Sequence, residues 1–232
     1  DPPVIEPQGL FDEPDNTPIF EYIAQFTQVV GALQGEFKDT IDPRLYELEY
    51  AVLPVLHRME ACGVLVDKQI LTELSTFLAQ EIQSLESEIY EYAGKKFNIN
   101  SPKQVAVVLF DEMGLKPLKK TKTGHSTDAQ TLGLLYQETQ EPMLKKILRY
   151  RELSKLKGTY VDALPRFIQR DGRIHTLLHQ TITETGRLSS SDPNLQNIPI
   201  RTEDGRRIRT AFIAADGNQL VSADYSQIEL RV

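Results

Sequence analysis

Residues 67–94, DKQILTELSTFLAQEIQSLESEIYEYAG, form the longest uninterrupted helical pattern in this sequence. Apolar residues recur at helical spacing from Ile70 to Tyr92, which predicts one unbroken α-helix. Asp67 supplies an N-cap acceptor and Gly94 a C-terminal stop. At ~1.5 Å per residue this helix is roughly 40 Å long. Such a length with a narrow apolar face is typical of an extended arm, and a coiled-coil segment is the alternative.

Shorter helices are predicted on both sides of this long one. Each begins where a polar cap or a proline meets an apolar stripe. These starts are Asp42–Pro43, Ser101–Pro102, Thr127/Asp128 and Glu141–Pro142. Weaker patterns predict helices over 19–33, where Gly31 and Gly35 interrupt the stripe, and over 159–168.

The sequence changes character after Arg173. RIHTLLHQTI (173–182) and GNQLVSADYS (217–226) alternate or run through apolar and β-branched residues, which predicts strands. DPN (192–194) and EDG (203–205) are typical turn sequences. Helices followed by strands, without strand–helix–strand alternation, predict an α+β fold.

The formal net charge of −7 hides a segregation of charge along the chain. An acidic balance by itself disfavours a nucleic-acid binder, since such domains are often basic. Residues 95–170, however, hold 15 Lys and Arg against 7 Asp and Glu, whereas residues 1–94 hold 18 acids against 4 bases. The middle of the chain therefore favours an anionic partner.

Other features exclude several classes of protein. The single cysteine, Cys62, cannot form an internal disulfide, and we expect it to pack as a small apolar residue in a reducing compartment. No apolar run approaches the ~18–20 residues of a membrane span. The acidic, proline-rich start is unlike a secretory signal. We therefore expect a cytoplasmic protein with no membrane partner.

Two cationic clusters lie within residues 95–170. The first is a loop of lysines among small residues, which can track phosphates, although a solvated surface loop is the alternative. Its lysines are Lys116, Lys119, Lys120 and Lys122. In the second, Arg151, Lys155 and in part Lys157 share one face of a helix, and Thr159 and Tyr160 add donors at its end.

The segment 175–212 is dense in uncharged hydrogen-bonding side chains and arginines. Such groups suit sugars, phosphates and the minor-groove acceptors of DNA without sequence-specific readout. His175 and His179 could be metal ligands, but no third ligand lies at matching spacing, so we discount that interpretation.

Asp224 follows the apolar run of 220–223. A carboxylate at the end of a strand is a recurrent place for Mg²⁺, and such an ion activates an attacking oxygen and stabilises a leaving group in phosphoryl transfer. One carboxylate does not make a two-metal site, and a helix N-cap is the alternative role for Asp224.

Together these residues resemble the polymerase domain of family A DNA polymerases, the bacterial DNA polymerase I family. The most specific strings are TGRLSSSDPNLQNIPIR (185–201) and VSADYSQIELRV (221–232). Matching strings upstream are FNINSPKQV (97–105), LKKTKTGHST (118–127) and YRELSKLKGTY (150–160). The resemblance covers roughly residues 43–232.

The resemblance implies a right-hand polymerase fold. A mostly helical thumb would comprise residues 67–165, and the first, incomplete part of an antiparallel-sheet palm would comprise 166–232, with the fingers absent. Residues 42–66 would be a lead-in helix at the palm base. Residues 1–41 would be a linker or the tail of a degenerate exonuclease-like domain.

The resemblance also implies roles for individual residues. Asp224 matches the first catalytic aspartate, which holds both Mg²⁺ ions, and the backbone carbonyl of Tyr225 is expected to ligate one of them. Glu229 matches the catalytic-site glutamate that acts as steric gate against ribonucleotides. The implied dNTP-binding residues are Ser226, Gln227, Ile228 and Glu229. The implied DNA contacts are Arg187, Asn194, Gln196, Asn197, Arg151, Lys155, Lys157, Thr159, Lys119, Lys120 and Lys122.

The implied reaction is addition of a dNTP to a primer 3′-hydroxyl by two-metal nucleotidyl transfer, in bacterial DNA replication and repair at the nucleoid. Primer–template DNA and dNTPs are the implied partners. The 232 residues lack the family's fingers, its second catalytic aspartate and its His-Asp-Glu string. We therefore expect no polymerisation without a complementary chain that carries them. The alternatives are a non-catalytic duplex-binding module and a helical interaction arm.

Overall fold

A computed structural model describes residues 17–37, 42–121 and 124–231 of the chain. The chain divides into two compact units, residues 1–58 and residues 59–232. The first unit contains α1 (Thr17–Phe37) and most of α2 (Pro43–Cys62). All later elements belong to the second unit.

The sequence predicts both helices of the first unit. α1 is longer than predicted and runs through Gly31 and Gly35, because a glycine costs only about 1 kcal/mol in a helix interior and the surrounding stripe is apolar. Asp42 begins α2 as predicted, since its Oδ1 accepts the backbone N–H of Arg44 at 2.9 Å. Pro54 lies inside α2 without ending it.

α3 (Lys68–Ala93) is the long helix that the sequence predicts. Asp67 Oδ1 accepts the backbone N–H groups of Gln69 at 2.8 Å and Ile70 at 3.3 Å. Gly94 ends the helix with a φ of 67°, a left-handed conformation that glycine adopts without a Cβ clash.

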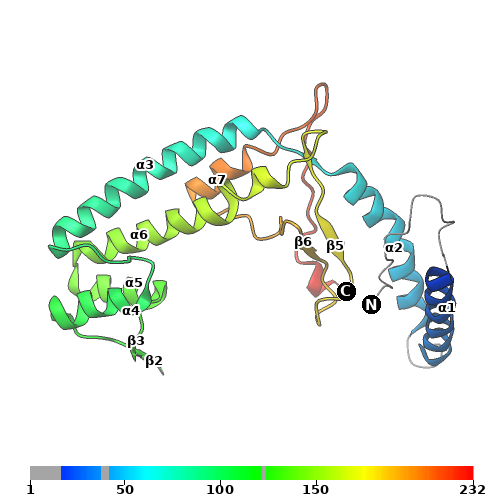
Figure 1. Cartoon of the computed structure of the whole chain (residues 1–232), viewed down its shortest axis with the longest axis horizontal. Coiled ribbons are helices and arrows are strands. Elements are labelled where there is room, and N and C mark those ends of the chain that lie inside the picture. Colours follow the sequence, from blue (N-terminus) through cyan, green and yellow to red (C-terminus); the bar gives the residue numbers. More distant parts are fainter. Residues whose placement is uncertain (1–16, 38–41, 122–123, 232) are drawn as a thin grey trace. The chain divides into compact units, whose positions relative to one another are not determined.

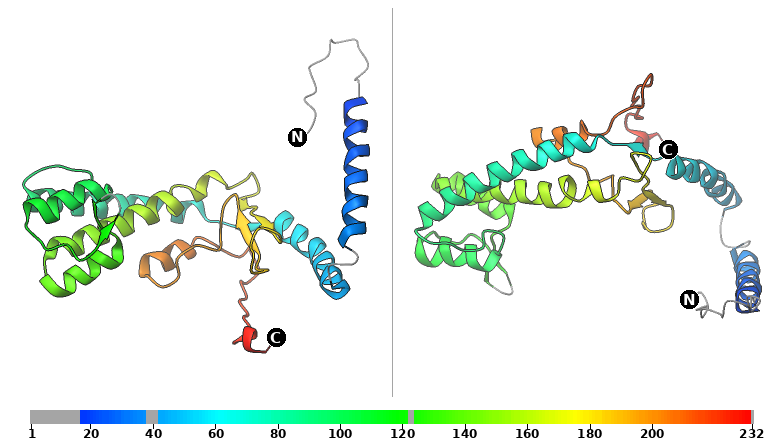
Figure 2. Two further views of the ribbon diagram at one scale, coloured as in Figure 1. Left: turned by 90° about the horizontal axis from the view of Figure 1, so that it is seen from below. Right: turned by 45° about the horizontal axis from the view of Figure 1, so that its top comes forward.

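α3 packs antiparallel against α6 (Pro142–Leu156), and the two helices run side by side in Figures 1 and 2. Leu71 near the start of α3 shares a cluster with Leu153 near the end of α6, whereas Ile89 near the end of α3 shares one with Leu144. The apolar stripe of α3 is thus covered by another helix of the same chain.

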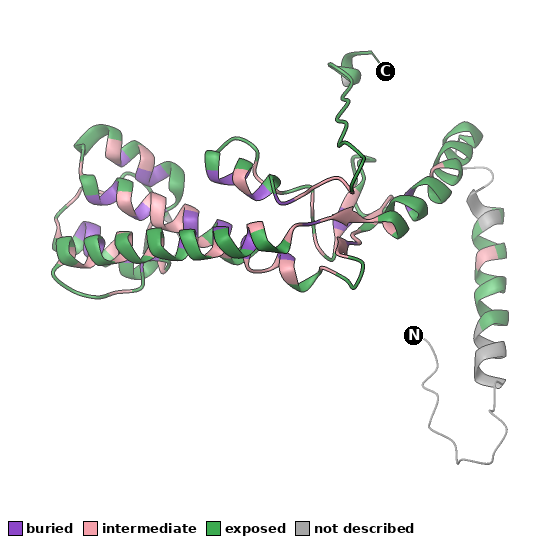
Figure 3. Ribbon diagram, turned by 90° about the horizontal axis from the view of Figure 1, so that it is seen from above, coloured by how far each residue is buried: buried purple, intermediate pink, exposed green. Residues whose placement is uncertain are grey.

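Two hydrophobic clusters lie at opposite ends of this helix pair, and Figure 3 shows buried positions recurring along its helices. Each fully buried Leu or Ile stabilises the fold by about 1.5–3 kcal/mol. The basal cluster comprises Val66, Leu71, Leu74, Leu78, Leu153, Leu156, Tyr160, Val161, Leu164, Ile174, Ile208 and Ala211. The distal cluster comprises Ile89, Ile99, Val105, Val108, Leu109, Phe110, Leu132, Leu135, Met143, Leu144 and Ile147.

Short elements between α3 and α6 close the distal cluster. Ser101, Asp128 and Glu141 cap the helices that follow them, as predicted. The elements are α4 (Pro102–Ala106), a π-helical segment (Val107–Glu112), β2 (Lys120–Thr121), β3 (Gly124–His125) and α5 (Ala129–Thr139).

The single helix predicted over 159–168 is wrong. α6 continues instead into a π-helical segment, Lys157–Val161, and then a 3₁₀ turn, Leu164–Arg166. Pro165 lies in that turn, and because proline lacks an N–H and its ring clashes with the preceding helical turn, it disfavours continuation of the α-helix there.

The remaining strands form small antiparallel pairs, so the chain is mostly helical with minor sheets. The strand predicted over 173–182 appears as two short strands, β4 and β5. The pairs are β1 (Val64–Leu65) with β4 (Arg173–Ile174), β2 with β3, and β5 (Leu177–His179) with β6 (Ser189–Ser191).

Two predictions for the C-terminal part are wrong. EDG (203–205) is no turn but begins α7 (Glu203–Arg209), because the Thr202 hydroxyl accepts the backbone N–H of Gly205 at 3.2 Å and caps the helix. Residues 217–226 form no strand, and Val221 is 88% exposed. A strand requires a neighbour to satisfy its backbone groups, and no described residue pairs with this segment.

Two further expectations concern Cys62 and membrane-spanning helices. Cys62 is exposed in the last turn of α2, so the expectation that it packs as a core residue is wrong. Among the described residues, no helix has both the length and the apolar character needed to cross a bilayer.

The burial pattern of α5 gives a direct test of the distal cluster. Leu132 is 0% exposed and Leu134 is 48% exposed on the same helix. Leu132→Ala is expected to lower the free energy of unfolding by about 2–5 kcal/mol, through lost contacts and a cavity. Leu134→Ala is expected to change it by no more than about 0.5 kcal/mol. Urea denaturation followed by circular dichroism measures both, and equal losses would contradict the packing of α5.

Candidate nucleic-acid interface

The predicted lysine loop forms a short hairpin at the distal end of the α3–α6 pair. β2 and β3 pair with Lys120 opposite His125, whose ring packs edge-on against Phe110 with centroids 5.3 Å apart. This contact attaches the hairpin to the distal cluster. Lys119 and Lys120 are exposed, and Lys122 lies outside the described residues.

Ser126 and Asp128 fix the base of this hairpin. The Ser126 backbone N–H donates to the Lys119 carbonyl at 2.9 Å, and its hydroxyl donates to Asp128 Oδ2 at 2.6 Å. Asp128 Oδ1 accepts the backbone N–H of Thr131 at 2.7 Å. The bonds from Ser126 and Thr131 lower the pKa of Asp128 to about 2, because they stabilise its carboxylate form.

Arg151 and Lys157 have partners inside the protein. The Arg151 guanidinium donates to the carbonyls of Ile99, at 2.9 Å, and Thr127, and burial lowers its pKa. Lys157 Nζ lies 2.6 Å from Asp162 Oδ2. The resemblance implied DNA contacts for both cations, and these remain predictions; because each is engaged inside the protein, the binding proposal rests on other residues.

Unlike Arg151 and Lys157, Lys155 and Thr159 are exposed. Both lie near the end of α6, next to the basal cluster. The exposed predicted cations therefore lie toward both ends of the long helix α3, which spans roughly 40 Å, similar to the ~34–36 Å of one turn of duplex DNA.

A polar loop, residues 194–197, follows β6 at the basal end. Asn194 Oδ1 accepts the Ser190 hydroxyl at 3.2 Å and the Gln196 backbone N–H at 3.0 Å, so its acceptor is engaged internally. The Tyr160 hydroxyl donates to the Asn197 carbonyl. Asn194, Gln196 and Asn197 are all exposed. The loop therefore uses acceptors inside the protein and presents amide N–H donors of Asn194 and Asn197 to solvent.

Leu195 within this loop and Ile198 directly after it face the protein. Leu195 and Ile198 pack against the basal cluster, and the Gln196 side-chain NH2 donates to the Leu188 carbonyl at 3.0 Å. Arg187 is exposed in the connection between β5 and β6, and its carbonyl accepts the Thr183 hydroxyl. The loop is therefore held in place on one side and open on the other.

Charged side chains attach α7 to the helix pair, a feature that the sequence reasoning missed. Arg149 of α6 lies 2.7 Å from Oδ2 of Asp204, whose side chain is only 8% exposed. The Arg207 guanidinium lies over the Phe77 ring of α3, 4.1 Å from its centroid, a cation–π geometry. The EDG string had suggested a turn, so nothing in the sequence pointed to a buried ion pair there.

Asp224 and its neighbours lie in the exposed segment that follows α7. Ser226, Gln227 and Ile228 are exposed at a turn, where Gln227 has a φ of 52°. Backbone bonds from Leu230 and Arg231 close a 3₁₀ turn, Ile228–Leu230, and the side chain of Glu229 lies outside the described residues.

The Asp224 carboxylate and the Tyr225 carbonyl are hard oxygen donors of the kind that Mg²⁺ prefers. Among the described residues, no group of three or more His, Cys, Asp or Glu is close enough to hold a metal ion. The donors therefore suit Mg²⁺ in kind, whereas their number falls short of a two-ion site.

The comparisons with known proteins bear on this arrangement. Residues 68–232 match the sequence model of DNA polymerase family A. The chain belongs to DNA polymerase family A. It is 56% identical over 191 residues to DNA polymerase I of Rhizobium leguminosarum, covering 81% of this chain and 19% of that protein. It is 52% identical over 210 residues to thermostable DNA polymerase I of Thermus aquaticus, covering 89% and 25%.

The family A chain also resembles a solved structure. The polymerase domain of Pol1 from M. smegmatis, in complex with DNA primer–template and dNTP, is 47% identical, with a TM-score of 0.73. The similarity covers 79% of this chain and 32% of that one. The chain thus spans about a fifth to a quarter of the two curated relatives and about a third of this polymerase domain.

The cap at the hairpin base predicts a pH-dependent stability. The pKa of Asp128 is lowered from 3.8 to about 2, so its contribution is present above pH 3.8 and is lost as the pH falls through about 2. Thermal unfolding measured across this range should show a stability loss that is smaller in Asp128→Asn, which keeps a capping oxygen without the titration. Identical pH profiles for the two proteins would contradict the assigned bonds.

Proposed function

We propose that this chain is the duplex-binding part of a DNA-directed DNA polymerase, comprising a thumb over residues 67–165 and the beginning of a palm over residues 166–232. The observation that carries the proposal is the polar loop of residues 194–197, which is exposed and is attached to the basal cluster through Leu195. The solved relative, which is bound to primer–template DNA and dNTP, supports the same assignment.

Each set of groups suits a different part of a duplex. Lys119 and Lys120 on the hairpin, and Lys155 near the end of α6, are exposed point charges suited to phosphates. Asn194 and Asn197 offer amide donors, and the minor groove offers acceptors at every base pair, adenine N3 and thymine O2 among them. Such contacts position a duplex without reading its sequence, as a polymerase requires.

The catalytic assignment rests on the segment after α7. We propose that Asp224 and the Tyr225 carbonyl would hold Mg²⁺, and that Ser226, Gln227, Ile228 and Glu229 would line the dNTP site. When bound, Mg²⁺ would supply Lewis-acid stabilisation of the charge that develops during phosphoryl transfer. With Asp224 as the one carboxylate among these proposed Mg²⁺ ligands, we expect the 232 residues to bind primer–template but to need a chain carrying the remaining ligands before a primer is extended.

A non-catalytic duplex-binding module is the second candidate function. It is favoured by the exposure of Asp224 in a segment that pairs with none of the described residues. The two candidates share the same interface and differ only in whether Asp224 acts in chemistry.

Binding is tested with fluorescently labelled primer–template and fluorescence anisotropy over a range of salt concentrations. The double variant Lys119→Ala/Lys120→Ala is expected to bind more weakly and to reduce the slope of log affinity against log salt by about 2, because two phosphate contacts are lost. Lys145→Ala, an exposed lysine of α6 outside the proposed contacts, is the matched control with an unchanged slope. Salt-independent binding, or no binding, would overturn the duplex-binding proposal.

Catalysis is tested by primer extension with Mg²⁺ and four dNTPs. The 232-residue chain is mixed with a second chain that carries the fingers and remaining palm of a family A polymerase. Extension is expected only in the mixture, and Asp224→Asn is expected to abolish it while duplex affinity stays unchanged. Duplex binding without extension in the mixture would favour the non-catalytic module.

A further inference from the structure

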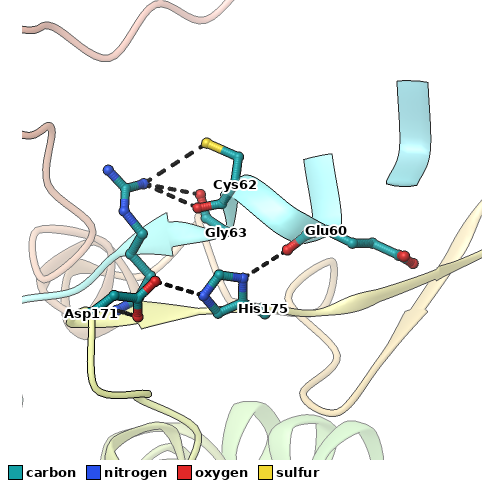
Figure 4. Close-up of polar contacts among 6 residues, drawn as sticks. Glu60, Cys62, Gly63, Asp171 and His175 are labelled. Carbon is teal, nitrogen blue, oxygen red and sulfur yellow. Dashed lines mark hydrogen bonds and ion pairs between the residues drawn. The ribbon is translucent and has the colours of Figure 1, made fainter. Parts of the chain in front are cut away.

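His175 lies between the last turn of α2 and the turn that precedes β4 (Figure 4). Its Nδ1 is 2.7 Å from the Glu60 carbonyl oxygen, and its Nε2 is 2.9 Å from Asp171 Oδ2. A carbonyl and an ionised carboxylate can only accept hydrogen bonds, whereas a neutral imidazole has a single N–H. Both contacts are therefore satisfied together only when both ring nitrogens carry protons and the ring is an imidazolium.

The surroundings suit a cation. The Glu60 carbonyl is among the last four of α2, which have no partner within the helix and lie at the negative end of its dipole. Arg173, two residues before His175, donates to the Cys62 and Gly63 carbonyls at 3.3 Å each. Strand periodicity places Arg173 and His175 on one side of the backbone, so both cations meet the end of α2.

The described charged and titratable groups around the ring come from three elements. Asp171 precedes β4, Arg173 belongs to β4, and Glu60 and Cys62 belong to α2. Asp171 also accepts the backbone N–H of Arg173 at 3.0 Å, which fixes its carboxylate beside the ring. The His175 side chain is 19% exposed, so solvent screens this pair only in part.

Gly63 leaves the space that the ring occupies. A Cβ at this position would lie 2.8 Å from His175 Nδ1 and Cε1 and 2.8 Å from the Ile174 carbonyl oxygen. Gly63 also has a φ of 60°, the left-handed region that favours glycine. Any side chain here would displace the imidazole from Glu60.

The same cluster connects to the polar loop. The Glu60 carboxylate accepts the backbone N–H of Leu178 in β5 at 2.6 Å, and β5 pairs with β6, which leads into residues 194–197. The Thr176 hydroxyl lies 3.0 Å from the Ser191 carbonyl and 2.8 Å from the Pro193 carbonyl. His175 and its neighbours thus hold the base of the hairpin from which the loop extends.

We propose that His175 is a positioning residue, held as an imidazolium, that clamps β4 and β5 to the end of α2 and thereby keeps the polar loop in place for duplex binding. The part that concerns DNA rests on the proposed function, whereas the clamp itself does not. Deprotonation of the ring turns one of its two contacts from attraction into repulsion between lone pairs.

The direction of titration follows from the contacts. The bond to the Glu60 carbonyl, then the bond to Asp171, raise the pKa of His175 above its ordinary 6.5, against smaller opposing effects of burial and of the neighbouring Arg173 charge. Because the folded-state pKa is the higher one, the clamp contributes its full stability below pH 6.5 and loses it as the pH rises through the folded-state pKa.

The protonation state is measured by NMR titration of the ring nitrogens in the 232-residue protein. The pKa of His175 is expected above 6.5 in the wild type and closer to 6.5 in Asp171→Asn. Gly63→Ala is expected to lower it as well, because the methyl group displaces the ring. Gly94→Ala is the matched control, since Gly94 also has a positive φ, 67°, but nothing lies within 4 Å of its Cβ position. A wild-type pKa at or below 6.5 would overturn the clamp.

The link to DNA is measured by primer–template anisotropy at constant ionic strength, from about pH 6 to about pH 8.5, the range in which histidines titrate. Wild-type affinity is expected to weaken by about fivefold or more as the ring deprotonates. His175→Gln should bind with the weaker affinity at every pH, whereas His57→Gln, on the exposed part of α2, should keep the wild-type profile.

The outcomes separate the two proposals. A raised pKa with a flat binding profile would retain the clamp and overturn its link to the loop. Absence of duplex binding at every pH would overturn the proposed function, and the NMR titration would still decide the clamp. If His175→Gln does not fold, the comparison of Gly63→Ala with Gly94→Ala carries the same test.

Discussion

The apolar contact between α3 and α6 organises the whole of the second unit. It turns one long helix, whose stripe is too narrow to form a core alone, into a paired element with a cluster at each end. The distal cluster carries the lysine hairpin through Phe110 and His125. The basal cluster carries the polar loop through Leu195 and Ile198. The spacing between cations and amides is therefore set by helix length, at ~1.5 Å per residue.

Polar groups divide into those that hold this framework and those that face outward. Arg151, Lys157 and Asp204 are engaged in bonds between elements and fix the hairpin, the end of α6 and α7. Lys119, Lys120 and Lys155 are exposed. A cation with a buried partner has already exchanged water for protein contacts, so it has little to gain from a phosphate. The exposed cations can still gain free energy from contact with a phosphate, so they are the better candidates for binding an anionic ligand.

Contacts between charged and polar groups also hold the end of α2 in place. Its last carbonyls lack helical partners, and β4 brings Arg173 and His175 to them. The two cations satisfy these orphan acceptors, and the Asp171 carboxylate pairs with His175, so the joint depends on charge as well as on shape. The β5–β6 hairpin, which leads into the polar loop, begins at this joint. The protonation of His175 is thereby linked to the position of the loop of residues 194–197.

Local sequence patterns were enough to predict most of the long helices, their caps and the family motifs, because helical periodicity and capping are properties of a few neighbouring residues. Asp67, Ser101, Asp128 and Glu141 cap helices as their spacing predicted. Which charges are available to a ligand emerged only from the folded chain: Arg151 and Lys157 have the same local signature as Lys155 but find internal partners. The same holds for the absence of a strand over 217–226, the Arg149–Asp204 ion pair that attaches α7 to α6, and the contact of His175 with the end of α2. Each of these depends on residues distant in the chain, whose approach is set by packing and not by local pattern.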